Sequence, residues 1–166
     1  MQVLSEPDIA ARIEQLVMHE LPGGRGFNAW RSLLHAHATL IRTLESDLER
    51  QTGLALADFD VLAQLAVAGG ELRMTDLAAK ALISRSGMTR RVARLVEEGL
   101  VRRASADADA RGVVVALTDS GVERLLETVP VHAHGIARLF VSQLDDQELA
   151  VLESALDKVT VDCTFG

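Results

Sequence analysis

The chain has 166 residues, of which 48% are apolar, 25% are charged and 3% are aromatic, and its formal net charge is −7. This length is enough for a domain with a buried core, and the only cysteine, Cys163, excludes a scaffold held together by internal disulfides. No apolar run approaches 18 residues and the first residues do not resemble a signal peptide, so the sequence predicts a cytoplasmic protein.

The first part of the chain is predicted to be helical. Apolar residues recur every three or four positions over 7–20, and again from Phe27 to about Gly53. This is the spacing of helices with one apolar face. A third, shorter helix is expected to follow and to end at Gly69-Gly70.

The middle of the chain predicts a helix-turn-helix followed by a β-hairpin. Thr75 is a candidate N-cap for a short helix over 76–82, and Ser84 is one for a second helix that stops at Gly99. Two β-like runs, 100–103 and 112–117, are joined by a polar stretch. This order is the winged-helix arrangement, so the predicted fold is mainly α, an α+β winged helix.

Two further helices are predicted after the hairpin. Thr118 is expected to cap a long helix that reaches about Ser142. Pro130 lies inside it and is expected to kink or split it, because the proline ring removes one backbone hydrogen bond. Asp145 and Glu148 have the spacing of a capping box, which predicts the start of a last helix.

Positive charge is concentrated in the predicted helix-turn-helix and hairpin. Nine basic and five acidic residues lie between Arg73 and Arg111, a net charge of +4, so the rest of the chain carries −11. A basic module within an acidic frame is typical of a protein that contacts DNA through one face. The alternative is an ordinary solvated charged surface.

The predicted helix after Ser84 presents a polar face suited to DNA. A helical wheel places the apolar side chains on one side, and the other side carries Ser86, Gly87, Arg90, Arg94 and Glu97, with Thr89 and Arg91 at its margins. Arginine can bind guanine O6 and N7 together, and hydroxyls can bind bases or phosphates. Ser84 and the free amides after it can bind a phosphate. The alternative is an amphipathic surface helix whose arginines serve solubility.

The hairpin tip carries a second candidate contact. Arg111 ends the polar stretch, and an arginine there can enter a narrow minor groove. Asp109 is positioned to orient its guanidinium through a bidentate pair. In isolation, this sequence would also suit an ordinary turn.

Three segments together resemble the MarR family of bacterial transcriptional regulators: 83–103, Asp107-Ala-Asp-Ala-Arg111 and Leu117-Thr-Asp-Ser-Gly121. The resemblance runs from about Phe27 to the end of the chain. It implies a homodimeric winged-helix protein that binds a palindromic operator on double-stranded DNA. Such proteins usually repress, and many release DNA when a small aromatic anion binds between the dimer helices and the DNA-binding lobe.

The resemblance also implies domains and contact residues. Its domains are N-terminal helices over 1–53 and C-terminal helices over 118–166, which form a dimerisation lobe, and a winged helix-turn-helix DNA-binding lobe over 54–117. The major-groove contacts would fall on Ser84, Ser86, Thr89, Arg90 and Arg94, and the minor-groove contact on Arg111.

Three kinds of signal known in the family can be compared with these residues. Peroxide sensing needs a cysteine near the start of the first long helix, where this chain has none. Zinc sensing needs clustered ligands, but the histidines of each close pair are two residues apart and point to different sides of a helix. No metal site or cofactor is predicted, and a zinc-responsive regulator is an alternative.

The third kind is urate sensing. That branch also has an extra N-terminal helix and is similar to this chain at Asp60, Arg91 and Arg103, but it expects a tryptophan on the extra helix, where this chain has none. The prediction is therefore a generic ligand pocket where the lobes meet, lined by Trp30, His35, Asp60, Arg91 and Arg103.

Two other classes of protein are less consistent with the sequence. The chain has no glycine-rich phosphate loop after a strand, no nucleophile elbow and no His-Glu-x-x-His, so it is not expected to be an enzyme. A winged helix used only for contact with another protein is a further alternative. The arginines Arg90, Arg94 and Arg111 on the DNA-facing elements argue against it.

Overall fold

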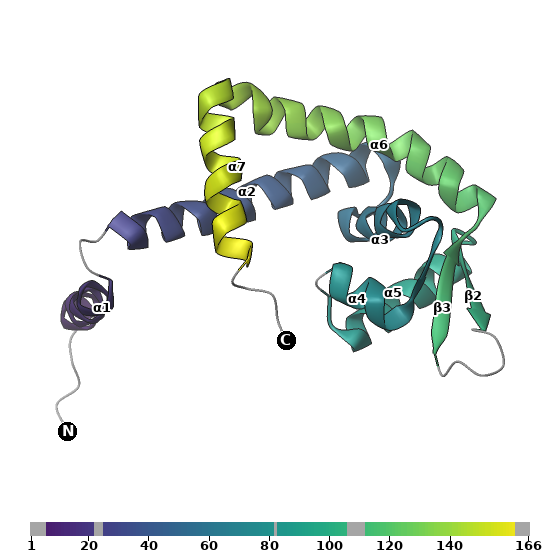
Figure 1. Ribbon diagram of the computed structural model, residues 1–166, viewed down its shortest axis with the longest axis horizontal. Coiled ribbons are helices and arrows are strands. Elements are labelled where there is room, and N and C mark those ends of the chain that lie inside the picture. Colours follow the sequence, from purple (N-terminus) through teal and green to yellow (C-terminus); the bar gives the residue numbers. More distant parts are fainter. Residues whose placement is uncertain (1–5, 22–24, 82, 106–111, 162–166) are drawn as a thin grey trace. The chain divides into compact units, whose positions relative to one another are not determined.

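The computed structural model of the protein describes residues 6–21, 25–81, 83–105 and 112–161 (Figure 1). Its elements follow in the order α1 (Glu6–Glu20), α2 (Arg25–Thr52), α3 (Leu56–Val67), β1 (Glu71–Arg73), α4 (Met74–Lys80), α5 (Arg85–Glu97), β2 (Val101–Ser105), β3 (Val113–Leu117), α6 (Asp119–Leu139), a short 3-10 turn (Val141–Gln143) and α7 (Asp146–Val161). Every predicted helix is present.

The chain divides into two units, Met1–Arg42 and Thr43–Gly166, and the long helix α2 begins in the first and ends in the second. In the first unit, α1 and the start of α2 keep large apolar side chains on their surfaces: Ile9, Ile13, Leu16, Trp30 and Leu34 are each between 45% and 56% exposed. No helix in the described part of the chain is long and apolar enough to cross a bilayer.

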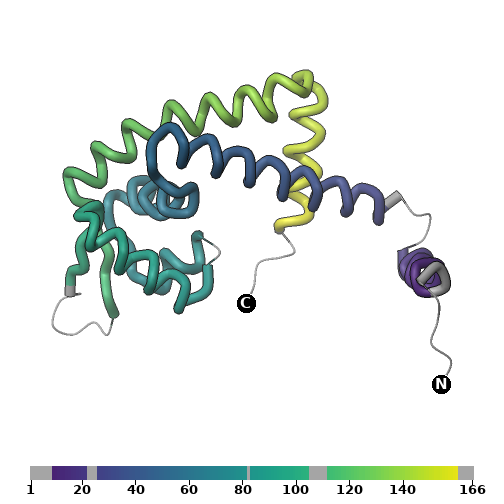
Figure 2. Tube along the Cα trace, turned by 180° about the vertical axis from the view of Figure 1, so that it is seen from behind, coloured from purple at the N-terminus to yellow at the C-terminus, as the bar shows by residue number. Residues whose placement is uncertain are grey.

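The core of the second unit lies around α3. Leu62 and Leu65 of α3 are completely buried, as are Leu77 of α4 and Leu95 of α5. These leucines form one cluster with the inner residues of the sheet and the last turns of α2. Burying such a side chain contributes about 1.5–3 kcal/mol, so this cluster fixes α3, α4 and α5 as one body. Figure 2 shows the three helices gathered beside the strands.

The sheet has three antiparallel strands in the order β1-β3-β2, so the predicted two-stranded hairpin gains a third strand. Leu72 of β1 is paired with Val115 of β3, whose other neighbour is Arg103 of β2. The addition satisfies the free backbone groups along the outer edge of β3, which would otherwise remain unpaired. Pairing of β1 with β3 also connects the residues before α4 to the hairpin that follows α5.

Local capping follows the sequence at three of the four predicted positions. Ser84 accepts a hydrogen bond from the Gly87 amide at 3.2 Å, and Thr118 accepts one from Gly121 at 3.0 Å. Asp145 and Glu148 form the reciprocal capping box. The prediction for Thr75 is wrong. Helix α4 begins two residues earlier than predicted, at Met74, and the Thr75 hydroxyl bonds to the Asp76 carboxylate.

Pro130 does not split α6, which runs unbroken from Asp119 to Leu139. Proline removes the hydrogen bond to the carbonyl of Leu126, four residues earlier. Both residues are exposed, so that carbonyl can bond to water instead. The helix therefore tolerates proline at this position.

Candidate nucleic-acid interface

Helix α5 is the second helix of the helix-turn-helix, and its apolar face fixes how it lies. Met88, Val92 and Leu95 are completely buried against the core, and α4 and β2 pack beside the helix. Gly99 follows its last turn with φ near +74°, a conformation that favours glycine. Because three buried side chains hold one face of α5, its opposite face is presented to solvent.

The exposed start of α5 carries the predicted polar contacts. Ser84, Ser86, Thr89 and Arg90 are all exposed. The Ser84 and Ser86 hydroxyls lie 3.4 Å apart, and the Thr89 hydroxyl donates to the Arg85 carbonyl at 2.9 Å, which leaves its oxygen free to accept. Together with the unpaired amides of the first turn, these groups form a surface that can accept and donate hydrogen bonds to a phosphate or a base edge.

Gly87 serves the cap itself. A Cβ at this position would lie 3.0 Å from Ile83 Cγ2 and 3.1 Å from the Ser84 hydroxyl. A larger residue would therefore crowd the hydroxyl that accepts the Gly87 amide. The sequence suggested room for DNA at Gly87, and the structure adds a second reason for a glycine in this turn.

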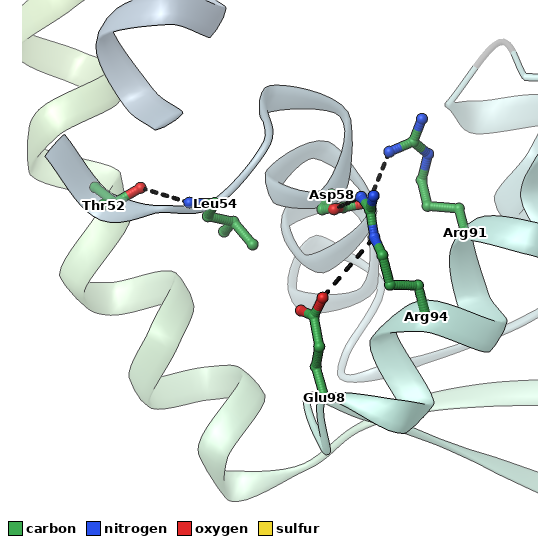
Figure 3. A network of polar contacts seen from close by, with 6 residues as sticks. All are labelled: Thr52, Leu54, Asp58, Arg91, Arg94 and Glu98. Carbon is green, nitrogen blue, oxygen red and sulfur yellow. Dashed lines mark hydrogen bonds and ion pairs between the residues drawn. The ribbon is translucent and has the colours of Figure 1, made fainter. Parts of the chain in front are cut away.

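The arginines in the second half of α5 are engaged by a buried acid, Asp58 of α3 (Figure 3). Arg91 donates to Asp58 Oδ1 at 2.7 Å, and Arg94 donates to Asp58 Oδ2. The Asp58 side chain is 3% exposed, whereas those of Arg91 and Arg94 are 27% and 49% exposed. Glu98 adds a second, weaker contact to Arg94 at 3.9 Å.

Asp58 is a residue of the candidate site that was not predicted from the sequence. The sequence nevertheless indicated that the Asp58 carboxylate would be buried and would need a partner. Asp58 lies four residues after Leu54 and four before Leu62, both of which are buried. A carboxylate in such a position must find charged or hydrogen-bonding partners when the helix packs. Its partners are 33 and 36 residues away along the chain, which local spacing does not reveal.

A second polar cluster joins α3, α5 and α6. Desolvation by burial raises the pKa of Asp60, although His132 and Arg91 act against this shift. Burial also lowers the pKa of His132, whose ring lies 4.7 Å from that of Phe59. Two buried atoms here, Arg91 Nε and His132 Nδ1, have no hydrogen-bond partner within the described part of the chain. The described residues therefore leave the hydrogen-bonding capacity of these two atoms unsatisfied.

The other predicted site residues fall in different places. Trp30 and His35 are exposed on α2 within the first unit, and Arg103 is exposed on β2. Asp109 and Arg111 lie outside the described residues. Over the described ranges, no three His, Cys, Asp or Glu side chains are grouped so that they could hold a metal ion.

Comparisons with known proteins agree with this geometry. The model of the MarR family matches residues 52–112, which span α3 to the hairpin. No curated protein matches the chain. Among solved structures, the chain is similar to Sco3205, a MarR family transcriptional regulator from Streptomyces coelicolor in complex with DNA. The two are 30% identical over 99% of this chain and 96% of that one, with a TM-score of 0.77.

Two further structures give the same result. AbsC, a MarR family regulator from Streptomyces coelicolor, is 26% identical over 98% of both chains, with a TM-score of 0.76. A mutant of MarR from E. coli complexed with operator DNA is 26% identical over 87% of this chain and 97% of that one, with a TM-score of 0.71. The winged helix, its exposed polar helix and the full-length similarity to Sco3205 lead to one conclusion: the chain belongs to the MarR family of transcriptional regulators.

Proposed function

We propose that the protein is a homodimeric regulator that binds a palindromic operator, represses transcription and releases DNA when a small aromatic anion binds. The observation that carries the DNA-binding role is the start of α5, where Ser84, Ser86, Thr89 and Arg90 are all exposed. The N-terminal residues of a recognition helix are those that reach base edges in the major groove. Asp109 and Arg111 are proposed to add the minor-groove contact. Such a protein acts on the chromosome in the cytoplasm, without an enzymatic step.

Unpartnered apolar surface supports the homodimer. Val122, Leu126, Val129 and Ile136 lie on one side of α6 at helical spacing, and each is at least 36% exposed. Helices α1, α2 and α7 also expose large apolar side chains. Such an apolar stripe is stabilised when a second copy covers it, and a two-fold dimer would present two α5 helices to half-sites about one helical turn apart.

The unpaired atoms beside Asp60 support the ligand response. Arg91 Nε can donate to an anion, and a neutral His132 Nδ1 can donate or accept. Of the predicted pocket residues, Asp60 and Arg91 are close enough to interact electrostatically. A small planar anion bound here would compete with Asp58 for Arg91, and it would thereby act on α5.

Selection of bound fragments from random DNA by the purified protein tests the proposal. We expect an inverted repeat with half-sites about 10 base pairs apart, bound by two chains as measured by light scattering. A single half-site bound by one chain would overturn the proposal of a dimer on a palindromic operator. The activity of a reporter gene placed under the selected site, measured with and without the regulator, then shows whether the protein represses or activates transcription.

The same duplex is used to test whether a small aromatic anion releases the protein from DNA. Phenolic carboxylates and urate are titrated into the complex, and release is followed by fluorescence anisotropy. An Arg91→Gln variant that still binds DNA should need more of the active anion, because one of its donors is lost. Unchanged sensitivity of this variant would show that the anion binds elsewhere.

A further inference from the structure

The four arginines of α5 are divided into two kinds by their contacts. Arg85 and Arg90, in the first two turns, are exposed and make no ion pair within the described part of the chain. Arg91 and Arg94, in the following turns, both bind Asp58. The helix therefore presents two free cations at its start and two engaged ones towards its end.

The contact with Asp58 restricts Arg94 in particular. Each oxygen of this carboxylate accepts from one arginine, Oδ1 from Arg91 and Oδ2 from Arg94. Asp58 is 2% exposed, so water cannot replace a departing guanidinium without rearrangement of the packing. Arg94 itself is half-exposed, and in Figure 3 its guanidinium lies between Asp58 and Glu98. It is close to the surface but is bound by acids.

This arrangement sets the charge that α5 offers to DNA. The free Arg85 and Arg90 add to the positive end of the helix dipole. Towards the other end, the charges of Arg91 and Arg94 are more than balanced by Asp58, Glu97 and Glu98. Non-specific affinity for DNA depends on how many phosphates are neutralised by basic side chains. One guanidinium withheld from the phosphates therefore lowers the affinity for any sequence.

We propose that Asp58 is a positioning residue that holds Arg94 away from the DNA backbone and so reduces the number of phosphates that α5 neutralises. This inference rests on the proposed DNA-binding role of α5, and it removes Arg94 from the set of predicted contacts.

The test is the salt dependence of DNA binding by the Asp58→Asn variant. Dissociation constants are measured by anisotropy from 50 to 200 mM salt, on the selected operator and on an unrelated duplex of equal length. If Arg94 is released to a phosphate, the log-log slope on unrelated DNA should steepen by about 0.9. Over this salt range, affinity should fall about 3.5-fold more than for the unmodified protein.

Two further variants separate release of Arg94 from other effects of removing a carboxylate. The double variant Asp58→Asn with Arg94→Gln should return the slope on unrelated DNA to its original value. Glu98→Gln also removes one negative charge beside Arg94, but it leaves the pair with Asp58 intact and should leave the slope unchanged. A steeper slope in Glu98→Gln, or one that persists in the double variant, would overturn the proposal in favour of a simple charge effect.

If Asp58→Asn does not fold, the salt dependence of Arg94→Gln in the otherwise unmodified chain is an independent test. The proposal predicts an unchanged slope on unrelated DNA, whereas a direct phosphate contact by Arg94 predicts a slope shallower by about 0.9 and would overturn it. If the unmodified protein binds the operator no better than unrelated DNA, the proposed function fails instead. The two failures are therefore distinguishable.

Discussion

Among the glycines in the described part of the chain, Gly121 has the least room for a side chain. It lies in the first turn of α6, where a Cβ would clash with the carbonyl oxygen of Leu100 and would also lie 3.3 Å from Leu117. The clash is with backbone, which cannot rotate away. Gly121 therefore allows α6 to begin directly against the chain that leaves α5.

Replacement of Gly121 by alanine should lower the free energy of unfolding by about 1–3 kcal/mol, the usual cost of forcing extra volume into a packed site. Gly135→Ala is the matched control, because its Cβ would meet only the end of the Leu44 side chain, at 2.7 Å. That side chain can move, and the gain in helix propensity of about 1 kcal/mol offsets the contact. Urea unfolding of both variants measures the difference. Equal stabilities would contradict the close approach of the Leu100 carbonyl to Gly121.

His132 makes stability depend on pH. Its pKa is lowered, first by burial, and Asp60 acts in the opposite direction. The unfolded chain, with a pKa near 6.5, therefore takes up a proton at higher pH than the folded protein does. Stability is lost as the pH falls through 6.5 towards the lower folded value. The raised pKa of Asp60 has the opposite effect, since uptake of a proton by its carboxylate favours the folded state at more acidic pH.

We expect His132→Gln to reduce the loss of stability between pH 7.5 and about pH 6, where His132 rather than Asp60 begins to titrate. The quantity to measure is the difference in unfolding free energy between these two pH values, so that any uniform cost of the substitution cancels. His134→Gln, at an exposed position on the same helix, is the control. A pH dependence reduced equally in both variants would refute the assignment.

At the scale of elements, α5 combines a buried face and a free charged start. Arg90 is exposed on this helix and has no ion-pair partner within the described residues. This distinguishes it from Arg94, although the sequence placed both on the same face. Arg90 can therefore contact DNA without giving up an existing pair.

Arg90→Ala should weaken binding to the selected operator by about 1–3 kcal/mol if the guanidinium reads a base. If it binds only a phosphate, affinity should fall similarly for all sequences and the salt slope should decrease by about 0.9. Arg50→Ala removes the same charge from an exposed position on α2 and is the control. Operator affinity of Arg90→Ala equal to that of this control would exclude α5 as the reading element.

At the scale of the whole molecule, the apolar stripe of α6 predicts assembly. Leu126 is 65% exposed at its centre. A charge introduced there would have to be buried in any dimer that covers the stripe, at a large energetic cost. The same charge on the polar side of the helix would remain in water.

Leu126→Glu should therefore shift the protein from dimer to monomer in sedimentation experiments and reduce operator affinity at least tenfold, because two half-sites are then no longer bound by one particle. His134→Glu adds the same charge about 80° further round α6 and should remain dimeric. A dimer in both variants would place the interface on other helices.

Much of this fold was predictable from local sequence. The helices, the hairpin strands and the caps at Ser84, Thr118 and Asp145 depend on residues within a few positions of each other. Pairing of β1 with β3 was not predicted, because it joins Leu72 to Val115 across most of the domain. The role of Asp58 was not predicted for the same reason, since its partners are distant along the chain.

By itself, the sequence determined that the protein is a helical winged-helix protein with a basic module in an acidic frame, since periodicity, capping and net charge are properties of the chain. It also determined which residue types lie on the polar face of α5. Only the tertiary structure decided which of those arginines are free, because packing of α3 against α5 buries Asp58 and the buried charge must be compensated by whichever cations lie within reach.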